Sequence, residues 1–176
     1  MAVRPPDEAL SAVSAMVARA RRALPDARWA GPEQWHLTLA FLGPVPELAP
    51  VVDGLRSLRG RGSFTLHLGG AGAFPSVRRA RVLWLGALGG REAVSSLAAG
   101  VASTLAPLGY EPEGRRFHPH LTLARLRVPG DVTGAVASVG DSPAGEAFTV
   151  EEFVLYESRP SARGSTYTAL ERVPLA

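Results

Sequence analysis

A seven-residue motif that occurs twice places the strongest constraint on the fold of this chain. His36-Leu37-Thr38-Leu39-Ala40-Phe41-Leu42 recurs as His120-Leu121-Thr122-Leu123-Ala124-Arg125-Leu126, with a difference at one position of seven. Side chains two apart on a strand point to the same face, so each copy predicts a strand with histidine and threonine on one face and apolar residues, including Phe41, on the other. Each copy follows a predicted helix. We therefore expect two related halves whose motif strands face each other across a cleft.

Helical and strand patterns interleave along the rest of the chain. The spacing of apolar residues predicts helices over residues 7–24, 46–58, 92–108 and 131–139, the first capped by Asp7 and ended by Pro25. Alternation predicts strands over residues 35–43, 63–68, 81–87, 119–126, 148–156 and 167–173. Helices interleaved with strands that include hairpins favour an α+β fold over a purely parallel sheet.

Length and composition exclude several kinds of protein and site. With 176 residues, 46% of them hydrophobic, and no low-complexity linker, we expect a single domain over residues 1–176. The absence of cysteine excludes a disulfide scaffold, a thiolate zinc site and a cysteine nucleophile. No segment resembles a signal peptide or a membrane span, so a cytoplasmic protein is expected. The basic residues are all arginine, and a formal charge of +3 favours recruitment of a phosphate-bearing substrate only modestly.

The paired histidines indicate acid/base chemistry. Two imidazoles with ordinary pKa values near ~6.5 can be held in opposite protonation states at neutral pH, so that one removes a proton while the other donates one. Opening a 2',3'-cyclic phosphate needs such a pair, because water must lose a proton as it attacks phosphorus and a ribose oxygen must gain one as it leaves. The hydroxyls of Thr38 and Thr122 can donate to non-bridging oxygens, and Arg125 can stabilise the developing charge.

Two other interpretations stay open at this point. His118 and His120 form an H-x-H pair that could supply two ligands to a metal, although no nearby acidic residue completes the shell. A nucleotide-binding or RNA-binding module could also use the same cleft without turnover, although it has no need of two titrating groups. Aromatic residues are candidates for stacking on a base. They are Trp35, Phe41, Phe74, Trp84 and Phe117.

The motifs resemble those of a known superfamily. The two H-L-T-L segments are similar to the paired H-x-T-x motifs of the two-histidine (2H) phosphoesterases, and the chain resembles the RNA 2',3'-cyclic phosphodiesterases of the LigT/ThpR-like group, formerly described as RNA 2'-5' ligases. Four further segments carry the resemblance. They are Gly72-Ala73-Phe74-Pro75, Arg81-Val82-Leu83-Trp84-Leu85-Gly86, the Phe117-His118-Pro119 lead into the second motif, and Tyr156-Glu157-Ser158.

The resemblance implies a fold, a reaction and a set of site residues. The implied fold is bilobal, with pseudo-symmetric halves whose antiparallel sheets line a central cleft and whose helices lie outside. The implied reaction is hydrolysis of an RNA or nucleotide 2',3'-cyclic phosphate to the 2'-phosphate, with reverse-direction ligation in some members. The absent thiolates and the carboxylate-poor motifs predict a reaction without a metal or cofactor, and the sequence indicates no obligate protein partner. His36 becomes the general acid toward the 3'-oxygen and His120 the general base toward water. Thr38, Thr122 and Arg125 become phosphate contacts.

Overall fold

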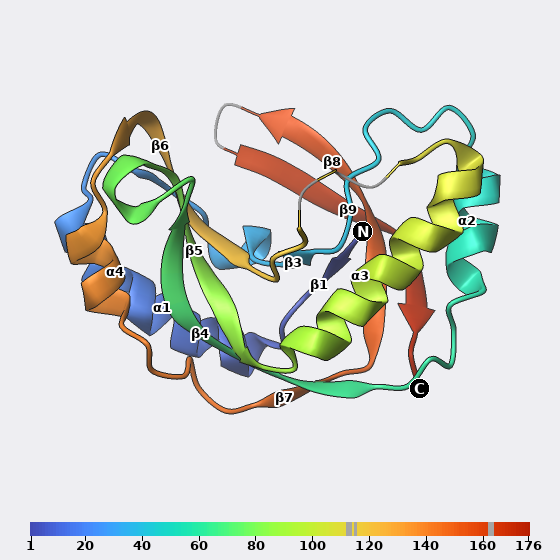
Figure 1. Cartoon of the computed structure of the whole chain (residues 1–176), viewed down its shortest axis with the longest axis horizontal. Helices are drawn as coiled ribbons and strands as arrows, with labels where there is room; N and C mark the ends of the chain where they lie inside the picture. The colour runs from blue at the N-terminus through green and yellow to red at the C-terminus, as the bar shows by residue number, and fades with distance from the viewer. Residues whose placement is uncertain (112–113, 115, 162–163) are drawn as a thin grey trace.

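Helices and antiparallel strands interleave along the chain and confirm the predicted α+β fold (Figure 1). The structure is a computed structural model that describes residues 1–111, 114, 116–161 and 164–176. The α-helices in these residues are α1 (Asp7–Ala20), α2 (Leu48–Arg56), α3 (Arg91–Leu105) and α4 (Thr133–Val139). The strands are β1 (Ala2–Val3), β2 (Arg28–Trp29), β3 (Leu37–Thr38), β4 (Phe64–Phe74), β5 (Ala80–Gly89), β6 (Leu121–Gly130), β7 (Phe148–Val150), β8 (Glu152–Ser161) and β9 (Gly164–Pro174).

The two motif strands lie side by side in the middle of an antiparallel sheet. Its strand order is β7-β4-β5-β6-β3-β1-β8-β9, and β2 pairs with β6 outside this path. The pairings between these strands are antiparallel. Because β3 and β6 are central, each is held by hydrogen-bonded neighbours on both sides. The sheet therefore brings together two motifs that are far apart in the sequence.

Two pairs of helices cover the sheet. Figure 1 shows α1 packed with α4 beside β4, and α2 packed with α3 near β9. Helix α1 buries Leu10, Val13 and Val17, because apolar residues recur along it at helical spacing. Full burial of one such side chain stabilises the fold by about 1.5–3 kcal/mol. Among the residues that the structure describes, no helix is long and apolar enough to cross a membrane.

The structure corrects three local predictions. The single strand predicted over residues 148–156 is two strands, β7 and β8, which pair with different neighbours. Asp7 does not cap α1: the N-cap is Pro6 without a side-chain cap, and Asp7 lies in the first turn, where it accepts a hydrogen bond from Arg4 at 3.4 Å. The strand predicted over residues 35–43 shrinks to β3. Regular strand pairing ends at Thr38, and beyond it Leu39 and Ala40 hydrogen-bond to the backbone of Met1. Phe41, predicted on the apolar face, is consequently 70% exposed.

Candidate active site

The register of β3 and β6 places the two motifs in direct opposition. Leu37 pairs with Leu121, and continuing this antiparallel register by one residue sets His36 opposite Thr122 and Thr38 opposite His120. Directly opposed residues have Cβ atoms about 4.5–5.5 Å apart on the same face of a sheet. The two histidines and two threonines therefore converge from two strands, as the repeat predicts. The strands are paired neighbours in one sheet, however, and do not face each other across a cleft.

The opposite face of both strands is closed by leucines. Each is at most 5% exposed, whereas the histidines and threonines are half-buried. The buried residues are Leu37, Leu39, Leu121 and Leu123. Strand alternation thus separates an apolar face, which packs into the core, from a polar face, which carries the chemistry.

The His36 imidazole is a desolvated base. Burial lowers its pKa from 6.5 to about 4, and the positive N-terminal ammonium contributes to the decrease. A hydrogen bond with the backbone of Gln34 raises the pKa, while the charges of Arg4 and His120 lower it further. His36 is therefore neutral at pH 7. A phosphate anion beside the ring would raise this pKa, because an opposite charge favours the charged form.

The His120 ring is held in one orientation by its own loop. Its Nδ1 lies 2.7 Å from the carbonyl oxygen of His118. Because a carbonyl only accepts hydrogen bonds, Nδ1 carries the proton and Nε2 of the neutral ring presents a lone pair. Burial lowers the pKa of His120, the bond to His118 raises it, and the charge of Arg125 lowers it. The His120 ring is thus held by the backbone two residues before it.

Aromatic side chains pack around His120. The ring of Phe74 meets that of His120 edge to face, with centroids 5.0 Å apart. Trp84 lies 4.5 Å from His118 and 6.3 Å from His120, again between centroids. Gly72 leaves room for this packing, because a Cβ there would collide with the Trp84 indole. These contacts restrict the rotation of the His120 ring.

A β-bulge turns Arg125 toward the cleft. Simple alternation from His120 would send Arg125 to the opposite face. The pairing of β5 with β6 shifts, however: Leu83 pairs with Ala124 but Trp84 pairs with Thr122, so β6 carries one extra residue. Such a bulge reverses the alternation beyond it. Arg125 therefore lines the same cavity as Thr122.

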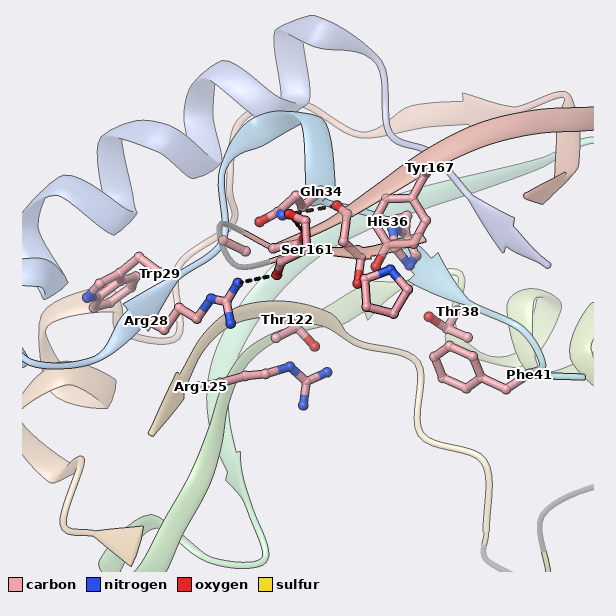
Figure 2. A pocket seen from close by; sticks show the side chains of 14 residues that line it. Arg28, Trp29, Gln34, His36, Thr38, Phe41, Thr122, Arg125, Ser161 and Tyr167 are labelled. Carbon is pink, nitrogen blue, oxygen red and sulfur yellow. Dashed lines mark hydrogen bonds between the residues drawn. The ribbon is translucent and has the colours of Figure 1, made fainter. Parts of the chain in front are cut away.

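The polar face opens into a cavity of about 260 Å³. Figure 2 shows Thr122 and Arg125 on one side of it and Thr38 and Phe41 on the other. His120 lies beside this cavity rather than among its lining residues, although its charge reaches His36. The described residues that line the cavity include no aspartate or glutamate. They are Arg28, Trp29, Ala30, Gln34, His36, Thr38, Phe41, Thr122, Arg125, Pro160, Ser161, Gly164, Ser165 and Tyr167.

The sequence patterns do not single out two residues of this cavity, Tyr167 and Arg28. The Tyr167 ring meets His36 edge to face, with centroids 4.8 Å apart, and restricts the imidazole as Phe74 restricts His120. Arg28 enters from β2, which has only two residues and therefore leaves no alternation to recognise. Tyr167 lies inside a predicted strand, but only the fold brings that strand to His36.

The aromatic residues that the sequence offers for base stacking differ in their exposure. Trp35 is 2% exposed and belongs to the core, which removes it from the candidates for base stacking. Phe41 remains a candidate for base stacking, because its exposed ring lines the cavity.

No group of three or more histidine, cysteine, aspartate or glutamate side chains in the described part of the chain is arranged to hold a metal ion.

Sequence comparison finds relatives over most of the chain. The profile of the 2'-5' RNA ligase superfamily matches residues 5–161. An RNA 2',3'-cyclic phosphodiesterase of Escherichia coli is 40% identical over 141 residues, which cover 78% of this chain and 73% of that protein. An RNA 2',3'-cyclic phosphodiesterase of Aeropyrum pernix is 34% identical over 149 residues, or 82% of this chain and 84% of that protein.

Solved structures show the same fold. The TT0787 protein of Thermus thermophilus superimposes with a TM-score of 0.80 at 31% identity, and the match covers 99% of this chain and 95% of that one. E. coli LigT in complex with 3'-AMP has a TM-score of 0.75 at 33% identity, with the same coverage. The resemblance inferred from the paired motifs is confirmed. The chain belongs to the 2'-5' RNA ligase superfamily.

Proposed function

We propose that this protein hydrolyses the 2',3'-cyclic phosphate of an RNA end or nucleotide to the 2'-phosphate, with His36 and His120 as its acid/base pair. The observation that carries the proposal is the opposition of the two H-x-T motifs across β3 and β6, beside a cavity whose described lining contains arginine and no carboxylate. The relatives named RNA 2',3'-cyclic phosphodiesterase support the choice of reaction.

The reaction requires one proton to be removed and one to be delivered. Nε2 of His120 takes a proton from water as the water oxygen attacks phosphorus. The bond between phosphorus and the 3'-oxygen breaks, and His36 gives its proton to that oxygen, which leaves the phosphate on the 2'-oxygen. Thr38, Thr122 and Arg125 donate hydrogen bonds to the non-bridging oxygens, where negative charge develops.

The protonation behaviour of the pair supports these roles. His120 has its Nδ1 occupied by the His118 carbonyl, so a neutral ring offers Nε2 as a base. His36, with a pKa of about 4, gives up a proton readily once it holds one. The bound phosphate anion raises that pKa and so supplies the protonated form when substrate is present. The roles of acid for His36 and base for His120 follow from the resemblance to the two-histidine phosphoesterases, and the bound anion makes the protonated form of the acid available.

Product identification tests the proposal directly. An RNA oligonucleotide that ends in a 2',3'-cyclic phosphate is incubated with the protein in the presence of a chelator, and the isomer of the terminal phosphate is determined. We expect the 2'-phosphate. Tight binding without turnover would instead indicate a binding module, and turnover that appears only after a metal is added would indicate a metal-dependent hydrolase that uses His118. Either result would contradict the proposal.

The lowered pKa values of His36 and His120 predict that kcat/KM is highest at a pH below 7. One imidazole must be protonated and the other neutral, so kcat/KM should be bell-shaped, with the limbs belonging to the pair rather than to single residues. Burial lowers both pKa values below 6.5. We therefore expect the maximum of kcat/KM below pH 6.5. The alkaline limb of kcat should lie at higher pH than that of kcat/KM, because bound phosphate raises the pKa of the acid.

This profile is measured with a nucleoside 2',3'-cyclic phosphate, with circular dichroism recorded at each pH. The spectra are needed because the folded-state pKa of His36 lies below its unfolded value, so stability is lost as the pH falls from 6.5 toward about 4. A kcat/KM that rises steadily into strongly alkaline solution would indicate attack by hydroxide or another base.

Phe41 is predicted to hold the base of the terminal nucleotide. It occupies the position of the motif that Arg125 occupies in the second copy, and both side chains line the cavity. Stacking of a base on an aromatic ring contributes about 1–3 kcal/mol. Phe41→Ala should therefore raise KM roughly tenfold, with a smaller effect on kcat. Val128→Ala is the control, since Val128 is 75% exposed and lies outside the cavity lining. Equal KM values for the two variants would contradict the stacking role.

A further inference from the structure

The side chain of His118 belongs to the aromatic cluster around His120, although the proposed reaction uses only its carbonyl oxygen. The His118 ring lies 4.5 Å from that of Trp84 and 5.6 Å from that of Phe74, between centroids. The same two side chains contact the His120 ring, Trp84 at 6.3 Å and Phe74 at 5.0 Å. These shared neighbours therefore fix the position of one imidazole relative to the other.

Packing holds the His118 ring in place. Its Nδ1 atom is buried and has no hydrogen-bond partner among the described residues. Burial lowers the pKa of the His118 ring, and the charges of His120 and Arg91 lower it further, so the neutral form is favoured. A neutral ring packed against two aromatic side chains serves as an anchor for its own backbone.

The next residue limits how the His118 carbonyl can turn. Pro119 is buried, its ring fixes its own φ, and it confines the residue before it to an extended conformation. The remaining freedom of the carbonyl is that of the His118 backbone, which the anchored side chain restricts. The carbonyl oxygen lies 2.7 Å from Nδ1 of His120. The proline and the anchored ring together direct this acceptor at the base.

The direction of the carbonyl decides which nitrogen of His120 can act as the base. A neutral imidazole carries its proton on one of its two nitrogens. While the carbonyl accepts the proton of Nδ1, the lone pair of Nε2 stays free. If the carbonyl turned away, the tautomer with the proton on Nε2 would become populated. A ring in that form cannot take a proton from water at Nε2.

We propose that His118 is a positioning residue of the reaction: its ring, anchored by two aromatic neighbours, keeps its own carbonyl on Nδ1 of His120 and so holds the base in the tautomer that presents Nε2. The inference rests on the proposed function, in which His120 is the base. It gives the His118 side chain a role that needs an aromatic ring but no ring nitrogen. A phenylalanine at this position should therefore fulfil the same role.

Three variants at position 118 separate packing from imidazole chemistry, with a chelator present throughout. His118→Ala should lower kcat about 10- to 100-fold, the cost of a misplaced catalytic group, while KM stays within about twofold, because the ring binds no substrate. His118→Phe should recover most of the rate. His118→Gln has a similar reach without a ring, so it should be as slow as His118→Ala, and it replaces that variant if alanine prevents folding.

Three kinetic results would overturn the positioning role. The first is a normal rate in a folded variant that lacks the ring. The second is a His118→Phe variant as slow as His118→Gln, which would mean that the imidazole nitrogens are needed. The third is a change confined to KM, which would place the side chain in substrate binding. Circular dichroism and melting temperatures establish that each variant is folded.

Nitrogen NMR of isotope-labelled histidine rings tests the inference without turnover. Nε2 of neutral His120 should be unprotonated in the wild type, partly protonated in His118→Ala and His118→Gln, and unprotonated again in His118→Phe. His67→Ala should leave the His120 signals unchanged, because His67 bonds to the carbonyl of Gly145. The expected change of tautomer in a protein without hydrolytic activity would remove the proposed function and leave the positioning role. An unchanged tautomer in the variants without a ring would remove the positioning role even if hydrolysis is observed.

Discussion

His36→Ala and His120→Ala are each expected to lower kcat by about 10²- to 10⁴-fold, since this is the usual contribution of one general acid or base. His120 is oriented by its bond to the His118 carbonyl and by Phe74, and His36 is packed against Tyr167, so a water molecule that fills either vacated space cannot reproduce the position of the ring. The double variant should be little slower than either single variant, because residues that act as a unit are not additive. Steady-state rates on a nucleoside 2',3'-cyclic phosphate measure these losses.

The control for these variants is His67→Ala. His67 bonds to the carbonyl of Gly145, away from the cavity, so its loss should leave the rate within about twofold of wild type, as is usual for independent sites. His36→Gln and His120→Gln, with melting temperatures compared, guard against unfolding of the alanine variants. A folded variant of either motif histidine that keeps a nearly normal rate would remove that residue from the acid/base pair.

Arg125→Ala is expected to lower kcat by about 10²-fold, the usual effect of removing one donor to a charge that develops in the transition state. The β6 bulge brings the Arg125 guanidinium to the face of Thr122. The described residues that line the cavity include no carboxylate with which it could form an ion pair. Arg125→Lys should recover only part of the loss, because an ammonium lacks the planar fork that matches phosphate. The rates of the three proteins are compared at saturating substrate.

Arg127→Ala provides a matched control for Arg125. Arg127 is also exposed and follows Arg125 by two residues on β6, but it does not line the cavity. Similar losses for Arg125→Ala and Arg127→Ala would mean that general surface charge, rather than a contact to the reacting phosphate, is responsible. A change confined to KM would indicate that Arg125 binds the ground state and transition state equally.

The sequence could predict features that depend on local patterns. The repeat identified the two motif strands, and alternation assigned histidine and threonine to one face and leucine to the other. Helical spacing located the four α-helices, although their ends differ by a few residues. These features follow from short-range periodicity and from the burial of apolar side chains, so they can be read without knowing which strands are neighbours.

The positions that required the tertiary structure depend on contacts between distant segments. Alternation alone sent Arg125 away from His120, and the bulge against β5 turned it back. Phe41 left the apolar face because it lies beyond the end of regular strand pairing at Thr38. Arg28 reached Arg125 only through the pairing of β2 with β6. The sequence by itself determined the family, the motif strands and the residues at their polar faces. The tertiary structure decided the register, the bulge and the burial that lowers the pKa of His36, because each of these is set by partners that local sequence does not specify.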